Sequence, residues 1–338
     1  MSIPRTVYPA PFNVTRASHV VMTVKDLGAS RAFYVDMLGF IISDEDADTL
    51  YLRGLEEACH HSLVLKKATE APSCERIGIR VYTEDDLEKT KAHFEHVGLP
   101  VKWVDVAHQG KTLHVSDAVG TPLEICATMP TKPRMIVKFQ HFKGAYPMRL
   151  DHFQILSPDV QRACEFYAGI GFRLSEYVAI DGTDDLVFIF LQRKGNTHDL
   201  VFVNGRGPRL HHFAFSVPDS HQLIHACDVA SSFGYGVKLE AGPGRHGPGH
   251  ALFVYFRDPD GHRLEFFTTH YQMMDIEIEP VRWDVSYLRN RPWGLPPPKS
   301  WYEEASPFAG TEPRNPERAT YAATLEALIA EEDKRSHL

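Results

Sequence analysis

The chain contains 338 residues, of which 43% are hydrophobic and 24% charged, as in ordinary globular proteins. Its formal net charge of −8 excludes the basic surface that nucleic-acid binding requires, so we expect a small molecule as partner. The sequence has no signal-peptide pattern and no apolar run of membrane-spanning length, so we expect no membrane partner and a cytoplasmic address.

The first predicted elements are an alternating strand and an amphipathic helix, within residues 18–40. The strand ends at Asp26, and the helix carries Phe33 and Tyr34 before a Gly-Phe stop. The remaining elements of this half are two strands, a second helix and a final strand, at 61–65, 77–81, 84–98 and 117–126.

The second half of the chain repeats the first. Residues 151–172 align with 18–40, so that His152 falls on His19. Three later segments align in the same order, namely 198–202 with 61–65, 213–217 with 77–81, and 258–267 with 117–126. Each copy reads as two βαβββ units, which predicts an α+β fold of four such modules in two curled sheets.

We expect four parts in the chain. They are an N-terminal metal-free domain at 1–147, a metal-binding catalytic domain at 148–270, a cover at 271–306 and a tail at 307–338. The proline-rich stretch 291–306 is expected to form no regular strand or helix, whereas the end of the tail is expected to form a surface helix.

Histidine is abundant, with 19 copies, while the five cysteines lack CxxC spacing. This composition argues against a disulfide framework and predicts a metal site of imidazole and carboxylate groups.

Strand alternation selects the candidate ligands. In "RLHHFAFSV", His212 shares a face with small residues, whereas His211 shares its face with bulky ones and is expected to pack beneath a helix. The same alternation places His152 on the face opposite Asp151, and puts a carboxylate, Glu265, on an apolar strand. His152, His212 and Glu265 therefore predict a facial set of two histidines and one carboxylate around a divalent metal.

The first copy provides an internal control. It keeps His19 and Glu124, but Arg76 occupies the position of His212, and a guanidinium cannot bind a metal. We expect Arg76 to pair with Glu124 in a metal-free scaffold. A lone strand histidine is more often a hydrogen-bonded core residue than a ligand, but three candidates at equivalent positions favour the metal site.

The second copy and the cover segment after it carry a set of motifs that resembles a known family. These motifs are "LDHF", "RKGNTHD", "GPRLHHFAFS", "GPGRHG", "YFRDPDGHRLEFFT" and "PKSWYEEAS". They resemble the type I extradiol ring-cleaving catechol dioxygenases of the vicinal oxygen chelate superfamily, closest to the homoprotocatechuate (3,4-dihydroxyphenylacetate) 2,3-dioxygenase branch. The resemblance implies Fe(II), with Mn(II) as the alternative, no organic cofactor, O2 as second substrate and a homotetramer.

The resemblance also implies roles for individual residues. His198 matches the acid/base histidine, Tyr255 the tyrosine that bonds the substrate oxygen, and His246 a substrate-contacting histidine of a glycine-rich loop. Further substrate-binding positions are Gln154, Phe190, Arg289 and Trp301.

Four positions qualify these assignments. Gln154 and Phe190 replace an asparagine and a tryptophan, and Ala241 replaces an arginine that helps to bind a substrate carboxylate. Arg291 competes with Arg289 for the second carboxylate-binding arginine.

The expected function is therefore extradiol cleavage of a catechol ring in aromatic-compound degradation. 3,4-Dihydroxyphenylacetate or another 4-substituted catechol is the expected substrate. The alternatives are a neutral alkyl or aryl catechol as substrate, a glyoxalase-type metalloenzyme, or a metal-free binding protein.

Overall fold

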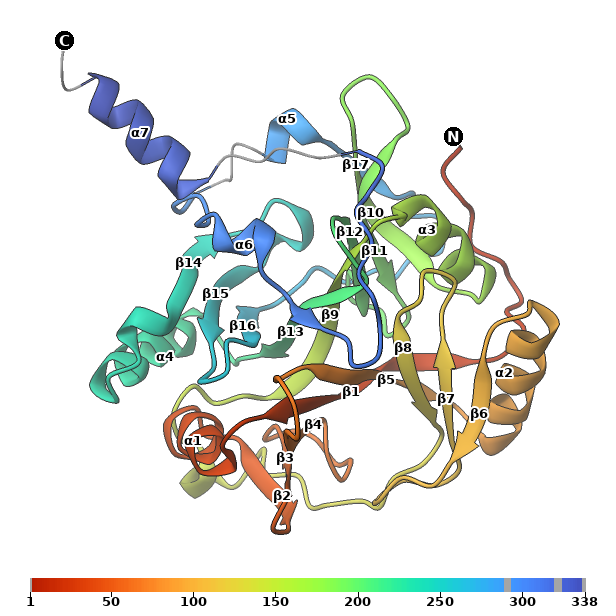
Figure 1. Cartoon of the computed structure of the whole chain (residues 1–338), viewed down its shortest axis with the longest axis horizontal. Helices are drawn as coiled ribbons and strands as arrows, with labels where there is room; N and C mark the ends of the chain where they lie inside the picture. Colours follow the sequence, from red (N-terminus) through yellow and green to blue (C-terminus); the bar gives the residue numbers. More distant parts are fainter. Residues whose placement is uncertain (1, 289–292, 319–323, 336–338) are drawn as a thin grey trace.

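The protein is described by a computed structural model that covers residues 2–288, 293–318 and 324–335. Two large sheets, one from each half of the chain, make up its body (Figure 1). The front half comprises β1 (Val14–Val24), α1 (Leu27–Arg31) with a following π-helical segment (Ala32–Met37), β2 (Ile41–Glu45), β3 (Thr49–Arg53), β4 (Leu63–Lys67), β5 (Cys74–Val81), α2 (Glu84–His96), β6 (Val101–Val104), β7 (Thr112–Ser116) and β8 (Pro122–Cys126).

The rear half repeats this order. It comprises β9 (Arg149–Ser157), α3 (Val160–Gly169), β10 (Arg173–Ala179), β11 (Leu186–Gln192), β12 (Leu200–Asn204), β13 (Arg209–Ser216), α4 (Ser220–Ser232), β14 (Leu239–Arg245), β15 (Leu252–Arg257) and β16 (Arg263–Thr268). The strand orders are β2-β3-β4-β1-β5-β8-β7-β6 in front and β14-β15-β16-β13-β9-β12-β11-β10 behind. Each sheet thus joins two βαβββ modules through one antiparallel pair, which confirms the predicted fold class.

The helices start and pack as their sequences indicate. Asp26 caps α1 and Asp159 caps α3, each accepting backbone N–H bonds from the first turn. Aromatic rings of the two halves meet at two places: the ring of Phe33 lies 5.3 Å from that of Tyr235, which follows α4, and Phe94 of α2 lies 5.7 Å from Phe166 of α3. One hydrophobic core therefore runs through both halves.

Two matching hydrogen bonds tie the halves together. Tyr34 of the front half donates its hydroxyl to Asp258 of the rear half at 3.0 Å, and Tyr167 of the rear half donates to Asp117 of the front half at 2.9 Å. All four side chains are buried. Because each buried carboxylate would be costly without donors, these bonds favour one mutual placement of the two sheets.

Two β-bulges interrupt the pairing of β9 with β13. Leu210 pairs with Ile155 and His212 with Gln154, so His211 is an extra residue in β13. Asp151 is likewise an extra residue in β9, between the pairs made by its two neighbours. A bulge changes the direction of its side chain, so simple alternation fails at both residues.

The C-terminal segments are more regular than expected. β17 (Val281–Asp284) extends the rear sheet beside β10, and α5 (Val285–Leu288) follows it. The expectation that 291–306 lacks regular structure is wrong, because α6 (Ser300–Glu303) and the start of β18 (Ser306–Pro307) lie within it.

The predicted tail begins as part of the body. β18 pairs with β13, and Phe308, which follows it, is fully buried in the core. The last described helix, α7 (Leu325–Arg335), projects from the body (Figure 1), as the sequence predicts for its surface helix. Among the described residues, no helix is long and apolar enough to cross a membrane.

Candidate metal centre

Three side chains converge on one point of the rear sheet. His152 comes from β9, His212 from β13 and Glu265 from β16, and all are at most 3% exposed. The Nε2 atoms of both histidines lie 3.1 Å from Oε2 of the glutamate. These ligand atoms, one from each residue, lie close enough together to hold one metal ion.

The tautomer of His212 follows from a chain of hydrogen bonds through its neighbour. Nε2 of His211 lies 2.9 Å from the carbonyl oxygen of Trp301, so this nitrogen carries the hydrogen. The Nδ1 atom of a neutral His211 is then an acceptor, and Nδ1 of His212 lies 2.8 Å from it and donates. The unprotonated atom of His212 is therefore Nε2, the atom that faces Glu265.

His152 is oriented by a carboxylate. Its Nδ1 lies 3.0 Å from Oδ2 of Asp151, whose two carboxylate oxygens also accept from Asn196 Nδ2 at 3.0 Å. This leaves Nε2 of His152 to face Glu265, the arrangement by which a carboxylate fixes a metal-binding histidine. The expectations that Asp151 points away from His152 and that His211 packs beneath a helix are both wrong, because each is the extra residue of a bulge.

Burial and charge make this centre a place for a cation. Burial opposes ionisation of Glu265, but its close contacts with His152, His212 and His246 outweigh it and hold the pKa of the carboxyl well below its usual range. Burial lowers the pKa of His212 to about 4, so this ring is neutral at physiological pH. For His152, burial is outweighed by its bonds to Asp151 and Glu265, which raise the pKa.

The donor set fits a six-coordinate divalent ion. Nε2 of His212 is buried and has no hydrogen-bond partner among the described residues, although such an atom normally has one. Ligand bonds of about 2.2 Å at right angles keep neighbouring donor atoms about 3.1 Å apart, close to the distances seen here. Two imidazoles and one carboxylate suit Fe(II) and Mn(II) alike.

Three polar side chains that the resemblance assigns to catalysis or substrate binding lie near this centre. The ring of His198, which is 5% exposed, lies 4.3 Å from that of His152. The hydroxyl of Tyr255 lies 2.9 Å from Nε2 of His246, and the same Nε2 lies 3.4 Å from Oε1 of Glu265. Burial lowers the pKa of His198 well below its usual value, so its ring is neutral and can accept a proton.

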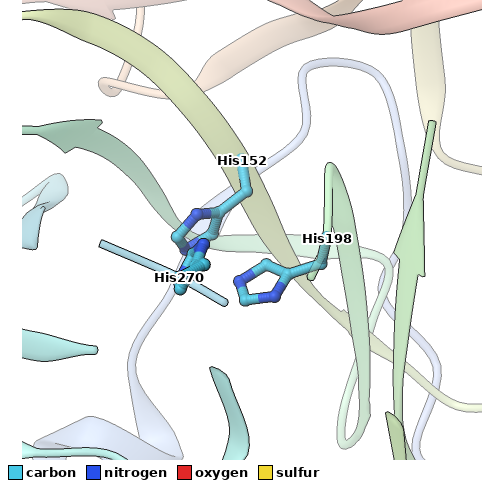
Figure 2. A group of neighbouring side chains, drawn as sticks. All are labelled: His152, His198 and His270. Carbon is cyan, nitrogen blue, oxygen red and sulfur yellow. The ribbon is translucent and has the colours of Figure 1, made fainter. Parts of the chain in front are cut away.

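One histidine of the centre escaped the sequence reasoning. His270 follows β16, with its ring 4.5 Å from that of His198 and stacked on Phe267 at 4.4 Å. Figure 2 shows the ring of His198 directed toward those of His152 and His270, and these three residues form a second possible metal-binding group. No periodicity could indicate His270, because it lies in a loop after the strand. Its only signal was the high histidine content.

The remaining predicted substrate residues lie at different distances from this centre. Phe190 packs 5.3 Å from the ring of His198, and Gln154 pairs in register with His212. Trp301 contacts Tyr255, with ring centroids 4.3 Å apart, as a cover residue should. Ala241, which is 7% exposed, pairs in register with Tyr255. Arg289 and its competitor Arg291 lie outside the described residues.

The equivalent place in the front half is filled by hydrogen bonds. Glu124 accepts from Nε2 of His19 at 2.8 Å, from Nε2 of His114 at 2.7 Å and from Gln109 at 2.6 Å. The expected Arg76–Glu124 ion pair is wrong: within the described part of the chain, Arg76 instead donates to the carbonyl of Leu123. Two of the hydrogen bonds to Glu124 come from His114 and Gln109. Neither residue was considered when the candidate ligands of the two copies were aligned.

Known proteins resemble this chain along most of its length. Residues 16–134 and 149–266 match the sequence profile of the glyoxalase/bleomycin resistance protein/dioxygenase superfamily. The manganese-dependent 2,3-dihydroxybiphenyl 1,2-dioxygenase of Geobacillus genomosp. 3 is 27% identical over 295 residues, which span 82% of this chain and 92% of that protein. The metapyrocatechase of Geobacillus stearothermophilus is 25% identical over 320 residues, spanning 89% of this chain and 96% of that one.

Solved structures agree with these relatives. An extradiol ring-cleaving dioxygenase from Brevibacterium fuscum superposes with a TM-score of 0.89 at 34% identity, covering 94% of this chain and 91% of that one. The homoprotocatechuate 2,3-dioxygenase of the same organism, in complex with 3,4-dihydroxyphenylacetate, gives a TM-score of 0.86 at 34% identity and covers 93% of this chain and 99% of that one.

Proposed function

The chain belongs to the glyoxalase/bleomycin resistance protein/dioxygenase superfamily, and within it to the extradiol catechol dioxygenases; from this premise we propose that His152, His212 and Glu265 hold Fe(II). The observation that carries the proposal is the convergence of two unprotonated Nε2 positions and one carboxylate at mutual distances suited to such an ion. Mn(II) is the alternative, because the donor set suits it equally and one relative is named manganese-dependent.

The protein supplies proton transfer beside this ion. His152, His212 and Glu265 would hold a divalent ion, which when bound would supply a path for electron density from a catecholate to O2. His198 takes a proton from a catechol hydroxyl and later returns one as the oxygen–oxygen bond breaks. Its neutral ring suits the first step, and because Nδ1 lies 2.8 Å from Thr197 Oγ1, Nε2 is the nitrogen that serves the substrate.

Tyr255 and His246 orient the substrate. Their mutual hydrogen bond of 2.9 Å keeps both groups beside Glu265. Each can donate to or accept from an oxygen of the bound ring, so together they orient the ring relative to His198. Trp301 closes the centre above Tyr255 and excludes water.

We propose a 4-substituted catechol as the substrate, with 3,4-dihydroxyphenylacetate as the first compound to test. A neutral alkyl or aryl catechol is the second candidate, and one observation favours it. Ala241 lies beside Tyr255, at a position where an arginine would present a charge to a substrate carboxylate.

We further propose a cytoplasmic homotetramer that acts in aromatic-compound degradation. The five cysteines are unpaired, as is typical of proteins in a reducing compartment. The tetramer is proposed from the family resemblance alone, and light scattering of the purified protein tests it.

Aerobic incubation with catechols tests the reaction. The Fe(II)-loaded protein should consume one O2 for each ring opened and produce a yellow semialdehyde from catechol, 4-methylcatechol or 3,4-dihydroxyphenylacetate. The His212→Ala variant should produce none. Failure to consume O2 with all of these catechols would reject the proposed function.

A substrate panel tests the specificity. 3,4-Dihydroxyphenylacetate should be compared with its methyl ester, which keeps the ring electronics and removes the charge. A higher kcat/KM for the ester identifies the neutral class, and a higher value for the acid supports the carboxylated substrate.

A further inference from the structure

A second group of possible metal ligands lies in the front half, apart from the centre already described. It consists of Asp44, His60 and His108. Oδ2 of Asp44 lies 3.5 Å from Nε2 of His108 and 3.9 Å from Nε2 of His60. The two imidazole rings stack with their centroids 3.9 Å apart and their planes at 7°.

Different segments hold these three residues in place. Asp44 lies on β2, His60 in the connection between β3 and β4, and His108 in the connection between β6 and β7. The φ angle of His108 is 60°, a left-handed conformation that side chains other than glycine seldom adopt. Tyr51 of β3 packs against both rings, at 5.6 Å from His60 and 4.8 Å from His108.

The neighbour of His60 leaves one of its nitrogens available to a metal. Nδ1 of His60 lies 3.1 Å from Nδ1 of His61, so one of these atoms donates to the other. When His60 is the donor, its Nε2 is unprotonated and faces Asp44. Burial is the main reason that the pKa of His60 is lowered to about 4, so the ring is neutral at physiological pH, as metal binding requires.

The same pairing of adjacent histidines occurs in the rear half. There, Nδ1 of His212 donates to Nδ1 of His211 and leaves its own Nε2 facing Glu265. His60 and His61 make the same Nδ1–Nδ1 contact in the front half, and a donating His60 leaves its own Nε2 free to bind. Both pairs are adjacent residues with buried rings.

We propose that Asp44, His60 and His108 form a second site, for a zinc-like divalent ion in tetrahedral coordination. Ligand bonds of about 2.1 Å at the tetrahedral angle keep donor atoms about 3.4 Å apart. Asp44 and His108 already have almost this separation, and Asp44 and His60 need to approach by a few tenths of an ångström. The more exposed ring of His108 also has to turn out of its parallel stack on His60, so that both Nε2 lone pairs point at one ion. Water completes the coordination, since the side chains of Asp44 and His108 are 48% and 32% exposed.

The local charges permit a cation. Lys132 donates to the carbonyl of Ser43 at 2.9 Å, and it lowers the pKa of His60 along with Arg53. The acidic run at 44–48 offsets these two positive charges, because it contains four carboxylates including that of Asp44. An ion at this place would connect β2 to two loops and stabilise the front half.

Metal-binding stoichiometry tests the proposal. The enzyme is dialysed against a chelator, and Zn(II) is then titrated by calorimetry and counted by elemental analysis after desalting. The wild type should bind two Zn(II) per chain, and the His108→Gln variant one. His96→Gln is the matched control, because His96 is an exposed histidine of α2, and it should still bind two.

A second pair of variants separates this site from the rear centre. His152 belongs to both possible metal groups of the rear half, so His152→Ala should bind one Zn(II), and the double variant with His108→Gln none. Zinc should raise the Tm of His152→Ala but not that of the double variant. The proposal is overturned if the wild type binds one ion, or if His108→Gln does not reduce the number of bound ions, either in the wild type or in His152→Ala.

Discussion

The two halves of this molecule have the same architecture and opposite chemistry. In the rear half, Glu265 faces two imidazole nitrogens that are unprotonated in the tautomers set by their neighbours. In the front half, the equivalent Glu124 accepts hydrogen bonds from His19, His114 and Gln109. The difference teaches that a buried carboxylate needs partners in either case, and that the neighbouring residues decide whether donors or a cation satisfy it.

The neighbours differ at the bulges. Asp151 and His211 are the extra residues of the rear strands, and each bonds a ligand histidine. In the front sheet, Ser18 of β1 and Glu75 of β5 are the extra residues of equivalent bulges. Ser18 still contacts the histidine beside it, but Glu75 forms an ion pair with a surface lysine. Both sheets therefore have the bulges. The identities of the bulge side chains differ, and this difference distinguishes the two centres.

Neutralising the two glutamates should give the largest contrast. Glu265→Gln should lose the ion, which contributes several kcal/mol to catalysis, so kcat/KM should fall by about 10²- to 10³-fold or more. Glu124→Gln should change kcat/KM by less than about threefold, but it should lower the free energy of unfolding by about 1–3 kcal/mol. Steady-state O2 uptake and urea denaturation measure the two effects. Equal losses of activity would refute the division of labour.

His198 and His61 occupy equivalent positions just before β12 and β4. Replacing each of them should give the next largest contrast. His198→Gln removes the proposed acid and base, which contributes about 10²- to 10⁴-fold, and kcat should fall accordingly while the metal content stays constant. His61→Gln in the front half should leave kcat unchanged. Elemental analysis of both variants is the control, because loss of metal from His198→Gln would indicate a ligand instead of a proton carrier.

The bulge residues should affect metal affinity more than chemistry. His211→Phe keeps the ring volume but removes the acceptor for Nδ1 of His212, and loss of such a partner typically weakens metal binding by about 10- to 100-fold. Glu75→Gln, at the front position, should not change it. Competition with a fluorescent chelator gives both dissociation constants. An unchanged constant in His211→Phe would show that the tautomer is set by other contacts.

The interface between the halves should respond almost equally to changes on its two sides. Tyr34→Phe and Tyr167→Phe each remove one buried hydrogen bond to a carboxylate, so each should lower the free energy of unfolding by about 1.5–3 kcal/mol. Urea denaturation of the two single variants tests this. A large effect in only one of them would mean that the two hydrogen bonds are not equivalent and that one of them contributes most of the stabilisation.

The sequence predicted most of the fold and the convergence of His152, His212 and Glu265, because repeats and alternation report local periodicity directly. The same alternation misplaced Asp151 and His211, since a bulge adds a residue without leaving a compositional trace. It also missed His270, which lies in a loop, and the partners of Glu124. These depend on which segments meet in space, and periodicity within one segment does not encode that information.

The bond between His211 and the carbonyl of Trp301 links β13 to a residue far later in the chain. During synthesis, His152, His212 and Glu265 leave the ribosome before Trp301 does. A nascent chain therefore has all its ligands before the hydrogen bond that directs one of them exists. The orientation of His212 therefore depends on the segment that carries Trp301, although that segment supplies none of the three converging side chains.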